Sequence, residues 1–225
     1  MPRVIVFDVN ETLLDLGALD PHFERSFGDP SVRKEWFNQL LQSALVATIT
    51  DTYADFGAIG AAALDMIAAR HGVTLSEEER TQILGGMHGL PPHPEVAESL
   101  GHLREQGFRL AALTNSTAEV GKKQLINAGL DGLFEQVLSA DTVGRLKPAP
   151  EPYRMAAERL DVDLSRIRLV AAHAWDVAGA LRAGCSAAFV ARPGKVLDPL
   201  APQPDIVGAD LREVTDRILE VEQGA

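Results

Sequence analysis

Short apolar runs alternate with helical patterns along most of this chain, and this alternation restricts its possible folds more than any other feature. The runs are rich in β-branched residues, which is typical of strands buried on both faces of a parallel sheet. Strands are predicted at Val4–Val9, Arg109–Leu113, Leu169–Ala172 and Ala187–Ala191, with a weaker run at Asp205–Gly208. Helices are predicted over residues 94–106, 117–128, 151–160 and 176–183. This order predicts an α/β fold with a doubly wound, Rossmann-like parallel sheet.

Helix boundaries carry their own signals in this sequence. Ser116 followed by Glu119, and Ser76 followed by Glu79, each have the spacing of a capping box and predict a helix start. Gly184 follows another helical pattern and predicts its end. These signals support the predicted order of elements.

One segment interrupts the alternation. From about residue 16 to residue 93 the pattern is helical throughout, and it ends at the proline-rich stretch 90–94. We expect an all-helical cap domain of residues 15–94, inserted into a catalytic core of residues 1–14 and 95–225. A helical module inserted after the first strand would lie beside the strand ends and act as a lid that excludes water.

Composition narrows the class of protein. Hydrophobic residues make up 46% of the chain and charged residues 24%, which is ordinary for a globular enzyme. The net charge of −11 argues against nucleic acid or an anionic membrane surface as a partner. No apolar stretch approaches the length of a membrane span. Cys185 is the single cysteine, so an intramolecular disulfide is impossible and a cytoplasmic location is expected.

Polar residues follow the predicted strands where each strand ends. Asp8 ends the first strand, Thr114 and Asn115 end the second, and Asp176 lies just past the third. Lys147 lies in a proline-rich loop between them. Alone, each is also explained as a helix cap, a turn residue or a surface lysine. Ligands in doubly wound sheets bind beyond the carboxyl ends of the strands, so we expect these side chains to meet in one site.

Together these elements resemble the haloacid dehalogenase superfamily over nearly the whole chain. The resemblance depends on FDVNETL at 7–13, LTNS at 113–116, KPAP at 147–150 and the final Asp176. It implies a hydrolase in which Asp8 is a covalent nucleophile.

The same motifs separate two branches of the superfamily. Magnesium phosphatases carry a second aspartate two positions after the nucleophile, whereas this chain has Asn10, an amide that cannot act as a general acid. In the last motif, AAHAWD, Asp176 is the single carboxylate, which makes a poor magnesium site. The stretch HAWDVAGALRAG is similar to the type II (L-2-haloacid) dehalogenases, a resemblance that implies no metal and no cofactor.

The resemblance also implies roles around the nucleophile. Asp8 attacks the substrate at Cα and forms an ester, and Lys147 keeps Asp8 ionised. Thr12 supports the nucleophile loop. Tyr153 lies near Lys147, and Asp176 positions and activates the water that cleaves the ester.

A second group of residues is expected to bind the substrate, a small organic acid. Thr114 and backbone amides near Val9 and Asn10 would hold its carboxylate. Asn115 would face the leaving group, and Trp175 would line the pocket. All of these roles come from the resemblance.

Two residues depart from the family pattern. Phe37 stands where the family has an arginine that assists halide departure, unless Arg33 or Lys34 takes that place. His173 stands where asparagine is common, and a histidine able to accept a proton from water would strengthen ester hydrolysis. A histidine satisfied by the backbone at a strand end is the alternative.

Several alternatives stay open. The absence of the arginine suits a leaving group that is not a halide, as in an azetidine-2-carboxylate-type ring-opening hydrolase. A magnesium-dependent small-molecule phosphatase and a binding module that has lost activity are further alternatives. A homodimer is expected from the family, which often dimerises through cap helices.

Overall fold

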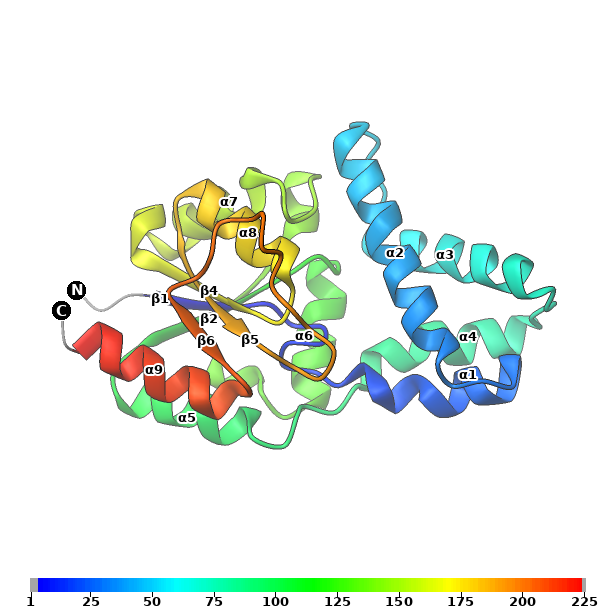
Figure 1. The fold of residues 1–225 in the computed structure, drawn as a ribbon, viewed down its shortest axis with the longest axis horizontal. Coiled ribbons are helices and arrows are strands. Elements are labelled where there is room, and N and C mark those ends of the chain that lie inside the picture. The colour runs from blue at the N-terminus through cyan, green and yellow to red at the C-terminus, as the bar shows by residue number, and fades with distance from the viewer. Residues whose placement is uncertain (1–3, 224–225) are drawn as a thin grey trace.

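A six-stranded, fully parallel sheet forms the centre of the protein in the computed structural model, which describes residues 4–223 (Figure 1). The strand order is β3-β2-β1-β4-β5-β6. The strands are β1 (Val4–Phe7), β2 (Arg109–Thr114), β3 (Gln136–Ser139), β4 (Ile167–Ala171), β5 (Ser186–Val190) and β6 (Ile206–Gly208). The predicted doubly wound α/β fold is confirmed, although residues 1–3 and 224–225 of the predicted core lie outside the described residues.

The sequence patterns missed strand β3 and the last helix, α9 (Leu211–Gln223). The reason is clearest for strand β3. It lies at the edge of the sheet, pairs with β2 alone, and its first two residues are only partly buried. An edge strand of this kind needs no continuous apolar run, and the residues around Gln136 have none.

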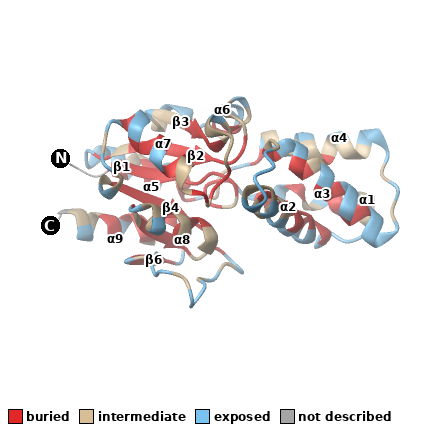
Figure 2. Ribbon diagram, turned by 90° about the horizontal axis from the view of Figure 1, so that it is seen from above, coloured by how far each residue is buried: buried red, intermediate tan, exposed pale blue. Residues whose placement is uncertain are grey.

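Helices cover both faces of the sheet (Figures 1 and 2). One face packs against α5 (Val96–Glu105), α6 (Ala118–Asn127) and α9 (Leu211–Gln223), and the other against α7 (Pro150–Leu160) and α8 (Ala174–Ala183). Alternate residues of β1 point to the two faces of the sheet. Ile5 and Phe7 pack in the core on the α5, α6 and α9 side, and Val4 and Val6 pack in the core on the α7 and α8 side. A strand buried on both sides therefore reads as an uninterrupted apolar run.

The segment between β1 and α5 contains only helices and loops, and it lies to one side of the sheet (Figure 1). Its α-helices are α1 (Asp20–Phe27), α2 (Val32–Ile49), α3 (Phe56–His71) and α4 (Glu77–Gly86). Short 3-10 turns occur here at Leu16–Leu19 and Met87–Gly89, and in the core at Asp131–Leu133, Ala140–Val143 and Leu164–Arg166. Among the described residues, no helix has the length and apolar character needed to span a membrane.

Two chain segments connect the helical body to the sheet, and they run side by side. The Asp15 amide donates to the Pro91 carbonyl at 2.8 Å, and the His93 amide donates to the Leu13 carbonyl at 2.9 Å. Because the two connecting segments are hydrogen-bonded to each other here, we propose that residues 15–94 form a cap domain on a core of residues 1–14 and 95–225.

Of the two predicted capping boxes, one is confirmed and one is wrong. Ser76 and Glu79 form the predicted capping box at the start of α4. The prediction at Ser116 and Glu119 is wrong, because Thr117 is the N-cap of α6 and its hydroxyl accepts from the Val120 amide. Ser116 instead donates its amide to the Thr114 hydroxyl, so it continues the strand-end loop.

Candidate active site

The sheet places the nucleophile candidate at the edge where neighbouring strands end. Phe7, the last residue of β1, pairs with Ala112 of β2 and Val170 of β4. The next residue, Asp8, donates its amide to the Val170 carbonyl at 3.0 Å and is 5% exposed. The ends of β2 and β4 therefore supply neighbours on both sides of the Asp8 carboxylate.

A single ammonium bridges the two aspartates predicted at this edge. Lys147 Nζ lies 2.9 Å from Asp8 Oδ1 and 2.6 Å from Asp176 Oδ2, and it also donates to the Leu113 carbonyl at 2.9 Å. The lysine side chain is completely buried. All three donor positions of the ammonium are therefore used, which offsets the desolvation of a buried charge.

This bridge sets the protonation states. Burial is the largest single influence and raises the pKa of Asp8. The Lys147 charge, His173 and the Thr12 hydrogen bond together outweigh it, so the net pKa lies below 3.8. For Lys147, burial lowers the pKa and the two aspartates more than reverse this, so the net pKa lies above 10.5. Burial raises the pKa of Asp176, and the nearby Asp8 charge adds to the shift. Asp8 is therefore ionised at neutral pH, as a nucleophile must be.

Thr12 fixes the other oxygen of the nucleophile. Its hydroxyl donates to Asp8 Oδ2 at 2.6 Å and accepts from the Ala172 amide at 2.9 Å. The hydroxyl links the nucleophile loop to the end of β4. With Oδ1 held by Lys147, both Asp8 oxygens have fixed directions.

Tyr153, on α7, holds the second aspartate. Its hydroxyl donates to Asp176 Oδ1 at 2.6 Å, and burial, followed by the Asp176 charge, raises the pKa of Tyr153 well above 10. The hydroxyl therefore stays protonated and donates. Tyr153 can approach this closely because α8 carries Gly179 here, where an added Cβ would lie 2.6 Å from the Tyr153 oxygen.

Asn115 holds the lysine loop. Its Oδ1 accepts from the Lys147 amide at 2.8 Å, and its Nδ2 donates to the Lys147 carbonyl at 3.3 Å. An amide nitrogen carries two hydrogens, so one remains for the leaving group that the sequence assigned to Asn115. That assignment stays a prediction.

The predicted carboxylate-binding groups lie in the same loop region. In the described part of the chain, the amides of Val9 and Asn10 donate no hydrogen bond, and Thr114 is 1% exposed beside them at the end of β2. The Asn10 side chain is held from behind, because Gln124 Nε2 donates to its Oδ1 at 3.0 Å. Gln124 also donates to the Met87 carbonyl at 2.8 Å, so it ties the nucleophile loop to the end of the helical insertion.

His173 faces the nucleophile loop with its Nε2 atom. This atom lies 3.3 Å from the Asn10 carbonyl oxygen, 3.5 Å from Glu11 Oε2 and 3.9 Å from Asp8 Oδ2. Because three oxygen acceptors surround Nε2, we assign a proton to it. The predicted role as a base then falls to Nδ1 and stays a prediction.

Aromatic rings form one wall around His173. Trp175 stacks on it with centroids 5.1 Å apart, and the Phe37 ring, from α2, lies 6.3 Å away. The structure thus brings Phe37 to the site. Arg33 forms an ion pair with Asp20 instead.

Two ion pairs in this region carried no sequence signal that we could interpret. Glu11, with φ of 61°, directs its carboxylate to the ammonium of Lys195. Arg192 donates to the Thr12 carbonyl at 2.9 Å and pairs with Glu95 at 2.5 Å. Both pairs join residues far apart in the chain, so no local pattern predicts them.

Comparison with known proteins places this geometry in a family. The model of haloacid dehalogenase-like hydrolases matches residues 2–184. The chain is 29% identical over 204 residues to (S)-2-haloacid dehalogenase 1 of Pseudomonas sp. (strain CBS-3), covering 89% of this chain and 90% of that protein. It is 29% identical over 207 residues to haloacetate dehalogenase H-2 of Moraxella sp. (strain B), covering 90% and 92%. The structure of L-2-haloacid dehalogenase from Xanthobacter autotrophicus has a TM-score of 0.91 at 25% identity, covering 98% and 99%.

Fold and site together define an α/β hydrolase in which a lysine-paired aspartate stands at the tip of the central strand. The chain belongs to the haloacid dehalogenase-like hydrolase family.

Proposed function

We propose that this protein hydrolyses small 2-substituted carboxylic acids, with (S)-2-haloacids as substrates, through an ester on Asp8. The observation that carries the proposal is the Lys147 ammonium held between Asp8 and Asp176 at 2.9 and 2.6 Å. It keeps the nucleophile ionised in a buried site. The named similarity to (S)-2-haloacid dehalogenases supports the choice of substrate.

In the first step, an Asp8 oxygen attacks Cα of the substrate. The leaving group departs with the electrons of its bond, and a single displacement inverts the configuration at Cα. The substrate carboxylate is held by the Thr114 hydroxyl and by the Val9 and Asn10 amides, which lack other acceptors among the described residues. Holding the acid in this way aligns Cα with the nucleophile.

In the second step, water attacks the ester carbonyl of Asp8. The bond between that carbonyl carbon and the substrate oxygen breaks, the 2-hydroxy acid leaves, and the carboxylate is restored. The net reaction consumes one water and releases one halide ion and one proton. Asp176, whose Oδ2 lies 2.6 Å from the Lys147 ammonium, positions the water, and the unprotonated Nδ1 of His173 takes up its proton.

The donor set at this site does not fit a divalent cation. Both carboxylates direct an oxygen at the Lys147 ammonium, which already supplies the local positive charge. The position two residues after the nucleophile is Asn10, whose side chain is bonded to Gln124 and Ser116. A magnesium ion prefers several free oxygen ligands, so we propose a reaction without a metal.

One observation favours a second candidate. The Phe37 ring stands beside His173, and the nearby Arg33 is paired with Asp20, so no guanidinium is assigned to a departing halide. The buried indole N–H of Trp175, without a partner among the described residues, is a neutral donor in this wall. This neutral wall also suits a nitrogen leaving group, as in ring opening of azetidine-2-carboxylate.

The test is a panel of substrates with and without EDTA. Chloride release from (S)-2-chloropropionate that EDTA does not reduce supports the proposal. If azetidine-2-carboxylate is hydrolysed and the chlorinated acid is not, the second candidate is supported. Hydrolysis of a chromogenic phosphate ester that EDTA abolishes would overturn both.

We also propose that the protein forms a homodimer. The end of α2 exposes apolar side chains, with Ile49 82% and Val46 53% exposed, and a second copy is a suitable cover for them. Light scattering of the purified protein at several concentrations decides between monomer and dimer.

A further inference from the structure

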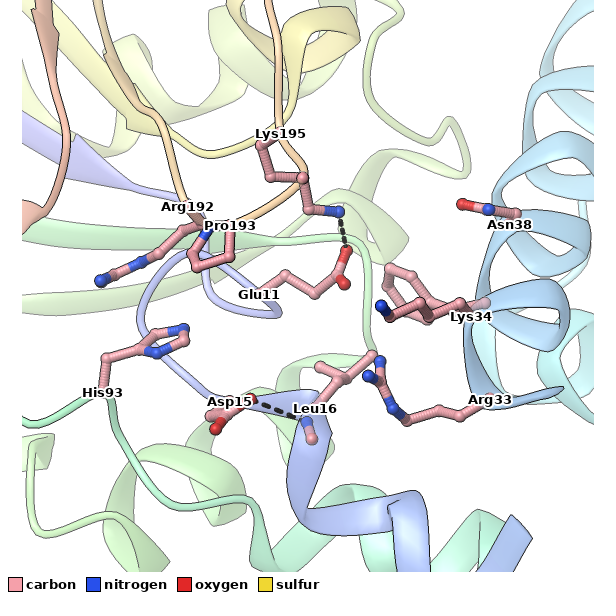
Figure 3. A pocket seen from close by; sticks show the side chains of 13 residues that line it. Glu11, Asp15, Leu16, Arg33, Lys34, Asn38, His93, Arg192, Pro193 and Lys195 are labelled. Atoms are coloured by element: carbon pink, nitrogen blue, oxygen red, sulfur yellow. Dashed lines mark hydrogen bonds and ion pairs between the residues drawn. The ribbon is translucent and has the colours of Figure 1, made fainter. Parts of the chain in front are cut away.

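A cavity of about 450 Å³ lies beside the catalytic centre, between helix α2 and the connection from β5 to β6 (Figure 3). Its lining contains four side chains that are cationic at neutral pH: Arg33, Lys34, Arg192 and Lys195. Two lining residues are acidic, Glu11 and Asp15. The lining residues thus carry two more cations than carboxylates in a chain whose formal net charge is −11, and a cation without a paired carboxylate in such a wall attracts an anion.

The cavity adjoins the nucleophile through its inner wall. Glu11 and Phe37 line the cavity, and both contact His173, at 3.5 Å from Nε2 and at 6.3 Å between ring centroids. His173 Nε2 lies 3.9 Å from Asp8 Oδ2. Only one side chain therefore separates the cavity wall from the nucleophile.

One cation in this wall is available to a ligand. Lys34 extends from α2 into the cavity, and its ammonium has no partner among residues 4–223 (Figure 3). The other cations are each paired: Arg33 with Asp20, Arg192 with Glu95, and Lys195 with Glu11.

A second unsatisfied group belongs to a residue of the same wall. His93 lines the cavity, and its Nε2 atom is buried without a hydrogen-bond partner in the described chain. Burial, followed by the charge of Arg192, lowers the pKa of His93, so its ring is neutral at pH 7 and can donate one N–H. A buried polar atom without a partner is destabilising unless a ligand or water satisfies it.

We propose that the natural substrate class is a 2-substituted dicarboxylate, whose second carboxylate enters this cavity and pairs with Lys34. This inference rests on the proposed function and extends it. A three-carbon acid is much smaller than the cavity, since cavities of about 300–1,000 Å³ hold drug-sized ligands. A carboxylate at the far end of a four-carbon acid matches the charge of the wall, whereas an alkyl group of the same length does not.

The experiment compares two chlorinated acids of equal carbon number. 2-Chlorosuccinate carries the second carboxylate, and 2-chlorobutyrate replaces it with a methyl group. Chloride release is measured for each with the full-length protein, and the readout is the ratio of the two kcat/KM values. We expect the diacid to be favoured at least five-fold.

The variant is Lys34→Gln, with Lys122→Gln on α6 as the matched control, because Lys122 is exposed and does not line the cavity. We expect Lys34→Gln to lower kcat/KM for 2-chlorosuccinate about five-fold, the range of one partly exposed ion pair. For Lys34→Gln, kcat/KM on 2-chlorobutyrate should stay within about two-fold of the native value. Lys122→Gln should leave kcat/KM unchanged for both acids.

Three outcomes would overturn the inference: no preference for the diacid in the native protein, equal losses on both acids in Lys34→Gln, or the same loss in Lys122→Gln. Each leaves the proposed function intact as long as 2-chlorobutyrate is still dechlorinated. Absence of chloride release from every acid would instead mean that the proposed function itself has failed.

Discussion

The Lys147 ammonium lies 2.6 Å from Asp176 and 2.9 Å from Asp8, so the two acids of the site are joined through one buried cation. Neither acid can be altered without changing the electrostatic surroundings of the other. The bridge explains how a carboxylate that is 5% exposed remains charged.

Replacing Lys147 by Met should move the acid limb of the reaction to higher pH. In the native protein the pKa of Asp8 lies below 3.8, because Lys147, His173 and the Thr12 hydrogen bond together outweigh burial. Without the lysine, burial dominates and raises the pKa of Asp8. The measurement is the pH dependence of Asp8 alkylation in a single turnover, followed by mass spectrometry. An acid limb at the same pH in both proteins would contradict the account.

The same pKa shift has a consequence for stability. A carboxylate with a lowered pKa in the folded state contributes stability that is present above about pH 3.8 and is lost as pH falls through the folded-state pKa. We therefore expect the native protein to lose more stability than the Lys147→Met variant between pH 4 and pH 2. Urea denaturation across this range measures the difference.

Replacing Tyr153 by Phe should slow ester hydrolysis more than ester formation. The change removes the 2.6 Å hydrogen bond to Asp176 and leaves Asp8 and its Thr12 partner in place. Leaving a buried acceptor unsatisfied costs about 1–3 kcal/mol of folding free energy. Rapid quenching should show the Asp8 ester accumulating before steady state.

Tyr53, the other tyrosine of the chain, provides the control because it is 45% exposed. Tyr53→Phe should leave the amount of ester unchanged. Equal ester levels in the native and Tyr153→Phe proteins would show that this hydroxyl has no part in the hydrolytic step.

Replacing Gly179 by Ala should displace the lysine loop. The added Cβ would lie 2.6 Å from both Pro148 Cβ and the Tyr153 oxygen, and 2.9 Å from the Pro148 carbonyl oxygen. We expect a loss of about 1–3 kcal/mol from this overpacking, together with a fall in kcat. Gly101→Ala is the matched control, because α5 has open space there and alanine should stabilise the helix by about 0.5–1 kcal/mol. The free energy of unfolding is measured from denaturation curves. A change of the same sign in both variants would contradict the prediction.

Replacing Glu95 by Ala should destabilise the protein strongly. Glu95 is the buried partner of Arg192, which also holds the Thr12 carbonyl of the nucleophile loop. An unpaired buried guanidinium costs about 3–5 kcal/mol. Glu98→Ala, which breaks an exposed pair with Arg212 nearby, should show no measurable loss. Comparable midpoints of urea denaturation for the two variants would argue against a structural role for the Glu95 pair.

The central elements of the fold were predictable because burial on both faces produces apolar runs that stand out in a sequence. Edge strand β3 has no such run, and it was missed. The grouping of Asp8, Lys147 and Asp176 followed from the rule that parallel strands end at one edge, together with the family resemblance. Thr117, rather than Ser116, caps α6, because neighbouring hydroxyls offer equivalent signals and only the loop conformation selects one.

The surrounding contacts were not predictable in the same way. Gln124 supports Asn10 across 114 positions of the chain, and Arg192 reaches Thr12 across 180. Such contacts depend on how loops from distant segments pack together, which no local periodicity records. A glutamine on an otherwise buried helix face was the one visible sign at position 124.

The ester on Asp8 is the centre of the account, and isotope transfer tests it most directly. A single turnover of (S)-2-chloropropionate in ¹⁸O-water, with enzyme in excess, should place the label in the Asp8 carboxylate, detected in the peptide that contains it. The 2-hydroxy acid released in that turnover should carry no label. Label in the product and none in Asp8 would mean that water attacks the substrate directly, which contradicts the nucleophilic role of Asp8.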